Sequence, residues 1–121
     1  MHKVAIILHA EPGTHDAMGR AAHALLYTKE LKEAGVDVKL IFDGGGTRWV
    51  TELAKGDNPL NDMYKSVKEI GAISGVCQFC IGAFGGDVED VKKTGLPLAG
   101  EYMGHPSLSS LIREGYQVIT L

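Results

Sequence analysis

Cys77 and Cys80 are the two cysteines of this 121-residue chain, and they lie together in the window Cys77-Gln-Phe-Cys80. The window follows an apolar run and opens a short segment predicted to be helical. A thiol at a helix N-terminus meets free N–H groups and the positive end of the helix dipole, both of which stabilise a thiolate. The spacing places the second sulfur about one helical turn from the first. We therefore interpret the pair as a site of sulfur chemistry rather than as two buried apolar side chains.

Three uses of such a pair are chemically reasonable: acceptance of a persulfide, dithiol–disulfide exchange, and half of a metal site. The metal site is the least favoured, because structural zinc needs four ligands, usually two Cys pairs or one pair with two spaced His. This chain has one Cys pair, and its histidines are scattered along the sequence. His9 or His105 could complete a site in space, but we expect no metal and no cofactor.

Other chemically useful residues follow the predicted strands. A histidine can donate a proton or stabilise a thiolate. A glycine run can bring backbone N–H groups to an anion, although Asp43-Gly-Gly-Gly-Thr47 matches neither nucleotide-binding glycine pattern. We interpret six residues as the pocket around the cysteines: His9, Asp43, Gly44, Gly45, Glu101 and His105.

Short apolar runs alternate with segments of helical periodicity along the chain. The predicted strands are residues 3–8, 36–42, 72–77, 96–100 and 116–121, with the fourth at a sheet edge because of Pro97. The predicted helices are residues 14–34, 47–54, 59–70, 79–84, 87–94 and 106–114. Their inward faces are expected to include Met18, Leu26, Ile70, Leu108, Leu111 and Ile112.

This alternation predicts one α/β domain over residues 1–121, with a five-stranded, mainly parallel sheet and helices on both faces. In such sheets the functional crevice lies beyond the carboxyl ends of the strands. The loops carrying His9, Asp43, Cys77 and His105 are all expected to meet there.

Composition narrows the possible partners. Twelve Lys and Arg against fifteen Asp and Glu give a net charge of −3, which lacks the basic surface of a nucleic-acid-binding protein. The first apolar run is too short for a signal peptide or a membrane span. We expect a cytoplasmic protein that binds neither nucleic acid directly nor membrane, with its thiols reduced.

Residues 1–121 resemble the DsrE/DsrF-like family, which includes sulfur-relay subunits of dissimilatory sulfur metabolism and of tRNA thiouridylation. The resemblance rests on the order of four segments: residues 4–9, residues 35–44, a strand that ends in Cys77 eight residues before Gly85, and residues 111–121. It implies a three-layer, flavodoxin-like fold, a persulfide carried on Cys77, a donor or acceptor protein, and an oligomer, often a trimer or hexamer. Cys80 goes beyond the basic pattern of the family.

The leading hypothesis is a cytoplasmic, sulfurtransferase-like sulfur carrier that accepts a persulfide on Cys77 and passes it to a partner thiol. Cys80 would resolve the persulfide or protect Cys77 as a disulfide. Two alternatives stay open at this point: a CxxC dithiol–disulfide oxidoreductase, and a non-catalytic oligomeric binding module with inert thiols.

Overall fold

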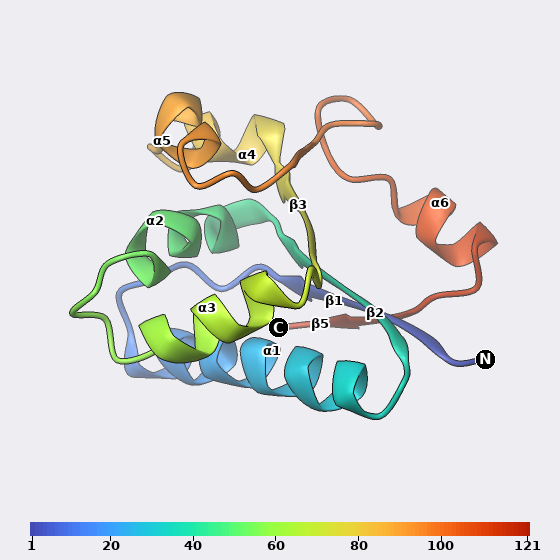
Figure 1. The fold of residues 1–121 in the computed structure, drawn as a ribbon. Coiled ribbons are helices and arrows are strands. Elements are labelled where there is room, and N and C mark those ends of the chain that lie inside the picture. The colour runs from blue at the N-terminus through green and yellow to red at the C-terminus, as the bar shows by residue number, and fades with distance from the viewer.

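Five parallel strands form the centre of the structure, a computed structural model that describes residues 1–121 (Figure 1). They are β1 (Lys3–Leu8), β2 (Asp37–Phe42), β3 (Ile73–Cys77), β4 (Leu98–Ala99) and β5 (Gln117–Thr120). The sheet order is β4-β3-β2-β1-β5, and every pairing is parallel. The predicted five-stranded α/β sheet is therefore confirmed. Because parallel strands end at the same edge, the segments after β1, β2, β3 and β4 meet there.

Most of the helices are shorter than the periodicity predicts. They are α1 (His15–Glu33), the 3₁₀ helix η1 (Gly44–Arg48), α2 (Trp49–Leu53), α3 (Asn61–Glu69), α4 (Gln78–Ala83), α5 (Val88–Lys92) and α6 (Leu108–Arg113). The helix expected over residues 47–54 begins earlier and is divided into η1 and α2. None of these helices combines the length and the apolar character that a membrane crossing requires.

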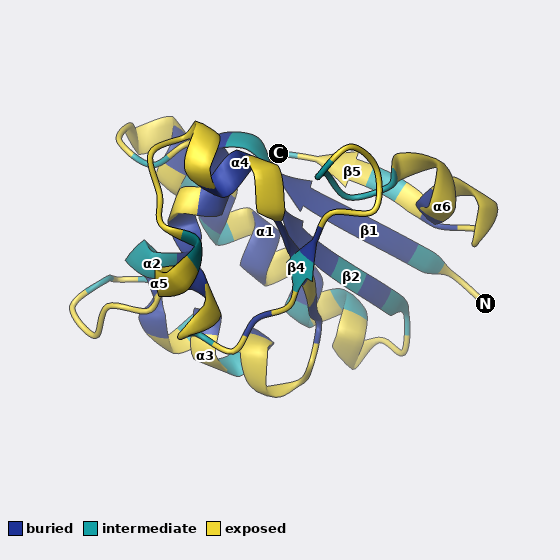
Figure 2. Ribbon diagram, turned by 90° about the horizontal axis from the view of Figure 1, so that it is seen from above, coloured by how far each residue is buried: buried dark blue, intermediate teal, exposed yellow.

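The two faces of the sheet are covered unequally. Alternate strand residues such as Ile6 and Leu40 join a core of 21 buried residues that packs under α1 and α3. The opposite face has a core of five residues, with Ile7 and Ile41 of the sheet against Leu111 of α6. Figure 2 shows β1 buried along nearly its whole length, whereas α6 is mostly exposed. The structure therefore has helices on both faces, but one layer is thin.

Several predicted core residues lie at the surface instead. Leu108 and Ile112 are 56% and 57% exposed, and only Leu111 of that face is buried. The six residues of α6 make fewer than two turns, so a single position can point at the sheet. Met18, Leu26 and Ile70 are also exposed. In α1 the buried side chains are mostly small, which lets the helix approach the strands closely: Ala17, Ala21, Ala24, Leu25 and Thr28.

Tyr116 links the last strand to the start of β2. Its hydroxyl donates a hydrogen bond of 2.9 Å to Asp37 Oδ2, and its ring lies beneath the ammonium groups of Lys3 and Lys39. Burial, followed by the hydrogen bond to Asp37, raises the pKa of Tyr116 to about 12. The neutral phenol is therefore the form that the folded state stabilises.

Replacing Tyr116 with Phe should lower the free energy of unfolding by about 1.5 kcal/mol at pH 7, because a hydrogen bond to a charged acceptor is lost. The pKa of tyrosine in the unfolded chain is about 10. The stabilisation is therefore fully present below pH 10 and is lost as the pH rises toward 12. Urea unfolding of both proteins at pH 7, 10 and 12 checks this. Equal stability at pH 7, or a difference that grows above pH 10, would contradict it.

Candidate functional site

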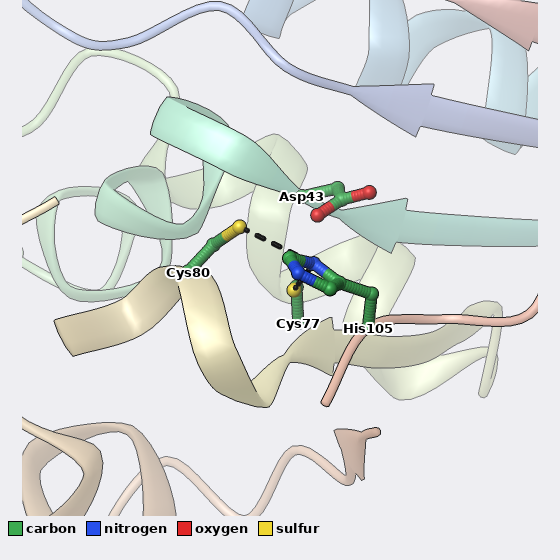
Figure 3. A group of neighbouring side chains, drawn as sticks. All are labelled: Asp43, Cys77, Cys80 and His105. Carbon is green, nitrogen blue, oxygen red and sulfur yellow. Dashed lines mark hydrogen bonds between the residues drawn. The ribbon is translucent and has the colours of Figure 1, made fainter. Parts of the chain in front are cut away.

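Four side chains of metal-ligating or nucleophilic type converge at the carboxyl edge of the sheet (Figure 3). Asp43 follows β2 and caps η1, Cys77 ends β3, Cys80 lies in α4, and His105 lies in the segment after β4. One ligand atom from each lies within 4.8 Å of every other. We call these four residues the Cys–His–Asp cluster. Each belongs to a loop or junction that the sequence predicted at this edge.

The two sulfur atoms share one imidazole nitrogen. His105 Nδ1 is 3.2 Å from Cys77 Sγ and 3.7 Å from Cys80 Sγ. Both cysteines are free thiols; Cys77 is fully buried and Cys80 is 7% exposed. The thiol of Cys77 also donates to the carbonyl oxygen of Gly104 at 3.8 Å. When Nδ1 carries no proton, it can accept the thiol proton of either cysteine.

The segment 100–107, which we call the His105 loop, is fixed over Cys77 by contacts with α4. Tyr102 and His105 exchange two backbone hydrogen bonds of 2.8 Å, and Phe79 N donates to Gly104 O at 3.0 Å. The Phe79 ring packs on the His105 ring with centroids 4.9 Å apart. Gly104 has a φ of 83°, which suits glycine in this tight turn. Phe79 and Gly104 were not among the predicted site residues. Their positions inside the CxxC window and next to His105 are the only sequence signals for them.

Asp43 is an anion held in place by two neighbours. Its Oδ1 accepts the Gly44 N–H at 2.8 Å, and its Oδ2 lies 3.4 Å from His9 Nε2. Hydrogen bonding from His9 is the main reason that the pKa of Asp43 lies well below its usual value. The cluster therefore contains a carboxylate at neutral pH. His9 belongs to the site through this carboxylate and not through the sulfurs.

Burial raises the pKa of the Cys77 thiol well above its ordinary value. The backbone N–H of Cys80 opposes this effect, but the hydrogen bond to Asp43 and the negative charge of that carboxylate add to it. The expected lowering of the Cys77 pKa by the helix N-terminus is therefore wrong for this structure. At neutral pH Cys77 is a thiol, and its reaction needs a base or a cation at the sulfur.

The remaining predicted pocket residues have different positions. The Gly44 N–H donates to Asp43 at the site. Gly45 is buried, and its Cα packs against Glu11. Glu101 is exposed, and its side chain makes no hydrogen bond or ion pair to the cluster; its place in the pocket stays a prediction. The glycine run allows close packing of η1, since a Cβ on Gly46 would lie 1.8 Å from Leu8 O.

A small hollow adjoins the cluster on the α6 side of the sheet. Its volume is about 190 Å³, and His9, Asp43, Pro106 and Thr120 are among its lining residues. Pockets for drug-sized ligands have about 300–1,000 Å³. This hollow therefore fits a small group rather than a nucleotide or a large cofactor.

Comparison with known families matches residues 2–121 to the DsrE/DsrF-like family. The chain belongs to this family. Among relatives of this DsrE/DsrF-like protein, an uncharacterized protein of Methanocaldococcus jannaschii is 34% identical over 99 residues, covering 82% of this chain and 78% of the relative. The resemblance seen in the sequence is thus confirmed.

Among solved structures, a conserved protein of unknown function from Bacteroides thetaiotaomicron has a similar fold. The TM-score is 0.62 at 20% sequence identity, and the alignment covers 98% of this chain and 94% of the other. At this identity the likeness concerns the fold alone. It supports the five-stranded α/β architecture of the DsrE/DsrF-like chain.

Replacing Gly46 with Ala should lower the free energy of unfolding by about 3 kcal/mol or more, because the new methyl group overlaps the backbone of Leu8. The shift of η1 would also move Asp43, its N-cap. Gly19→Ala is the matched control, since a Cβ there has nothing within 4 Å and should add about 0.5–1 kcal/mol. Urea unfolding compares the two. A Gly46→Ala protein as stable as the parent would show that this close approach does not exist.

Proposed function

We propose that this DsrE/DsrF-like protein is a cytoplasmic sulfur carrier that accepts a sulfane sulfur on Cys77 and passes it to a thiol of a partner protein. Membership of the family supports the proposal in general. The observation that carries it is the 3.2 Å contact between Cys77 Sγ and His105 Nδ1. A nucleophile with a base in hydrogen-bond reach is the arrangement that activates a thiol of raised pKa.

The first half of the relay is an exchange at sulfur. His105 Nδ1 takes the proton of Cys77, and the thiolate attacks the outer sulfur of a donor persulfide, R–S–SH. The S–S bond of the donor breaks, and its thiolate leaves and recovers a proton from the imidazolium. The products are Cys77–S–SH and R–SH. No external oxidant or reductant is needed, because the sulfane sulfur only changes its carrier.

The second half repeats the exchange in the other direction. A partner thiolate attacks the outer sulfur of Cys77–S–SH, and Cys77 leaves as a thiolate that regains a proton. Hydrogen bonding from the Cys80 backbone lowers the pKa of Cys77 and so favours negative charge on its sulfur. Cys80 supplies a side route, in which its thiolate attacks the inner sulfur of the persulfide. That step forms a Cys77–Cys80 disulfide and releases hydrosulfide.

Access to the sulfur requires movement of the His105 loop, because Cys77 is fully buried. The rim above it is apolar and exposed: Phe79 is 59%, Tyr102 65% and Met103 79% accessible. In the proposal, the partner packs on this rim and displaces the loop. A homo-oligomer, a trimer or hexamer, is part of the same proposal and is measured by light scattering.

Treatment of the reduced, chelator-treated protein with cysteine persulfide should add one sulfur atom, which peptide mass spectrometry should locate on Cys77. Cys77→Ser should abolish the addition, and Cys80→Ser should retain it. His23→Ala, an exposed change on α1, serves as the matched control and should behave like the parent. Sulfur that remains on the protein after Cys77→Ser would contradict the assignment of Cys77 as acceptor.

Dithiol–disulfide exchange is a second candidate, favoured by the position of Cys80 Sγ 3.7 Å from the same imidazole nitrogen. The two functions differ in their dependence on Cys80. For a sulfur carrier, Cys80→Ser should leave persulfide transfer to a thiol acceptor within about twofold of the parent, since the mechanism needs one thiol. Two activities measured on the same proteins distinguish these functions: sulfur transfer to a thiol acceptor, and disulfide reduction with dithiothreitol as the electron donor. Fast disulfide turnover that Cys80→Ser abolishes, without sulfur transfer, would favour the oxidoreductase.

A further inference from the structure

The donor set of the Cys–His–Asp cluster fits a thiophilic metal ion as well as it fits sulfur chemistry. Two thiols, an imidazole nitrogen and a carboxylate oxygen approach from three segments of the chain, since the two cysteines share the junction of β3 and α4. Soft thiolates combined with imidazole favour zinc among the divalent ions of the cell. The sequence disfavours a metal because one Cys pair supplies only two ligands. The fold supplies two more, since it brings Asp43 and His105, which are far from the cysteines along the chain, next to them.

The distances agree with a four-coordinate site. Tetrahedral zinc, with Zn–S of about 2.3 Å and Zn–N or Zn–O of about 2.0–2.2 Å, spaces its donor atoms about 3.3–3.8 Å apart. His105 Nδ1 is 3.2 Å from Cys77 Sγ and 3.7 Å from Cys80 Sγ. The longest separation among the four donors is 4.8 Å at most. Small side-chain rotations are therefore enough to place all four around one ion.

We infer that the reduced Cys–His–Asp cluster binds one Zn²⁺ through Cys77 Sγ, Cys80 Sγ, His105 Nδ1 and a carboxylate oxygen of Asp43. Binding replaces the proton of each thiol by a bond to the metal and releases these protons to solvent. Four protein ligands leave no open position, as in structural zinc sites.

Neighbouring groups already orient the donors. Gly44 N–H and His9 hold the two oxygens of Asp43, and each oxygen keeps a further lone pair for a metal. The Phe79 ring packs on His105 and limits its rotation. Hydrogen-bonded carboxylates and fixed imidazoles are typical of the groups that surround metal ligands. His9 is therefore a positioning residue for the ion rather than a ligand.

Zinc and sulfane sulfur would compete for the same atom, a consequence that rests on the proposed function. Cys77 Sγ cannot be both a zinc ligand and the nucleophile that accepts sulfur. Occupancy by zinc would keep the buried thiols reduced and unreactive until the ion is removed. The metal thus provides a chemical control over the relay.

The inference is tested by titrating the reduced, metal-free protein with Co²⁺ and then with Zn²⁺, without any sulfur donor. One equivalent of Co²⁺ should produce the absorption bands of a tetrahedral ion with thiolate ligands, and Zn²⁺ should displace it. Cys80→Ser and His105→Ala should each weaken binding by about 100-fold or more, because even the partners of ligands contribute about 10–100-fold. His9→Ala should weaken it by about 10–100-fold, while the exposed His23→Ala should bind like the parent.

No thiolate-to-cobalt absorption, or a Zn²⁺ affinity unchanged by both Cys80→Ser and His105→Ala, would overturn the inference. Cys80→Ser is a conservative change at a small side chain, so it keeps the test valid if His105→Ala does not fold. The outcome is separate from that of the sulfur-carrier proposal. Zinc binding without persulfide formation would refute the carrier alone, whereas persulfide formation without zinc binding would refute the zinc site alone. If both occur, Zn²⁺ should block sulfur addition, and a chelator should restore it.

Discussion

The contact between the His105 ring and the two thiols is the interaction on which the candidate site depends. Cys77 is fully buried, and the polar neighbours of its sulfur include His105 Nδ1, Gly104 O and the Asp43 carboxylate. Without the imidazole, the chain would hold a buried thiol of raised pKa beside a negative charge, with no base to take its proton. With the imidazole protonated on Nε2, the same sulfur has a proton acceptor, Nδ1, at 3.2 Å. The proposed sulfur relay and the proposed zinc site both rely on this one nitrogen.

The sheet makes this contact possible because its parallel strands deliver residues distant in sequence to one edge. Asp43 follows β2, Cys77 ends β3 and His105 lies after β4, and these strands are adjacent in the order β4-β3-β2. Close packing then sets their final positions. Gly46 lets η1 approach the backbone at Leu8, and Gly104 lets the His105 loop approach Phe79. A few glycines thus determine how near the carboxylate and the imidazole come to the sulfurs.

The elements and most of the site could be predicted from the sequence, because they depend on local patterns. Apolar runs located the strands, and the rule that parallel strands share a carboxyl edge placed Asp43 and His105 near the cysteines. The raised pKa of the Cys77 thiol could not be predicted in this way, since its burial and its contact with Asp43 depend on packing between segments far apart in the sequence. Leu108 and Ile112 were assigned to the core because their apolar character was visible, whereas the shortness of α6 was not. Glu101 and His105 lie in the same loop, Glu101 exposed and His105 in contact with the thiols, and sequence position cannot tell the two apart.

The imidazole contact is also the feature that the two proposed chemistries share. A neutral Nδ1 with a free lone pair can accept a thiol proton or bind a metal ion, and the sulfurs beside it can carry sulfur or coordinate zinc. Whether the cluster carries sulfur or coordinates zinc depends on whether a persulfide donor or a zinc ion reaches it. Asp43 matters in both cases, because its negative charge disfavours a free thiolate and favours a bound cation.

The most direct test of this account is the nitrogen NMR spectrum of the histidine side chains in the reduced, metal-free protein. The account predicts that His105 carries its proton on Nε2, with Nδ1 as acceptor, and that the Nδ1 signal shifts in both Cys77→Ser and Cys80→Ser while the His23 signals stay unchanged. A His105 Nδ1 signal that neither substitution moves would show that the imidazole does not contact the thiols, and would contradict the account.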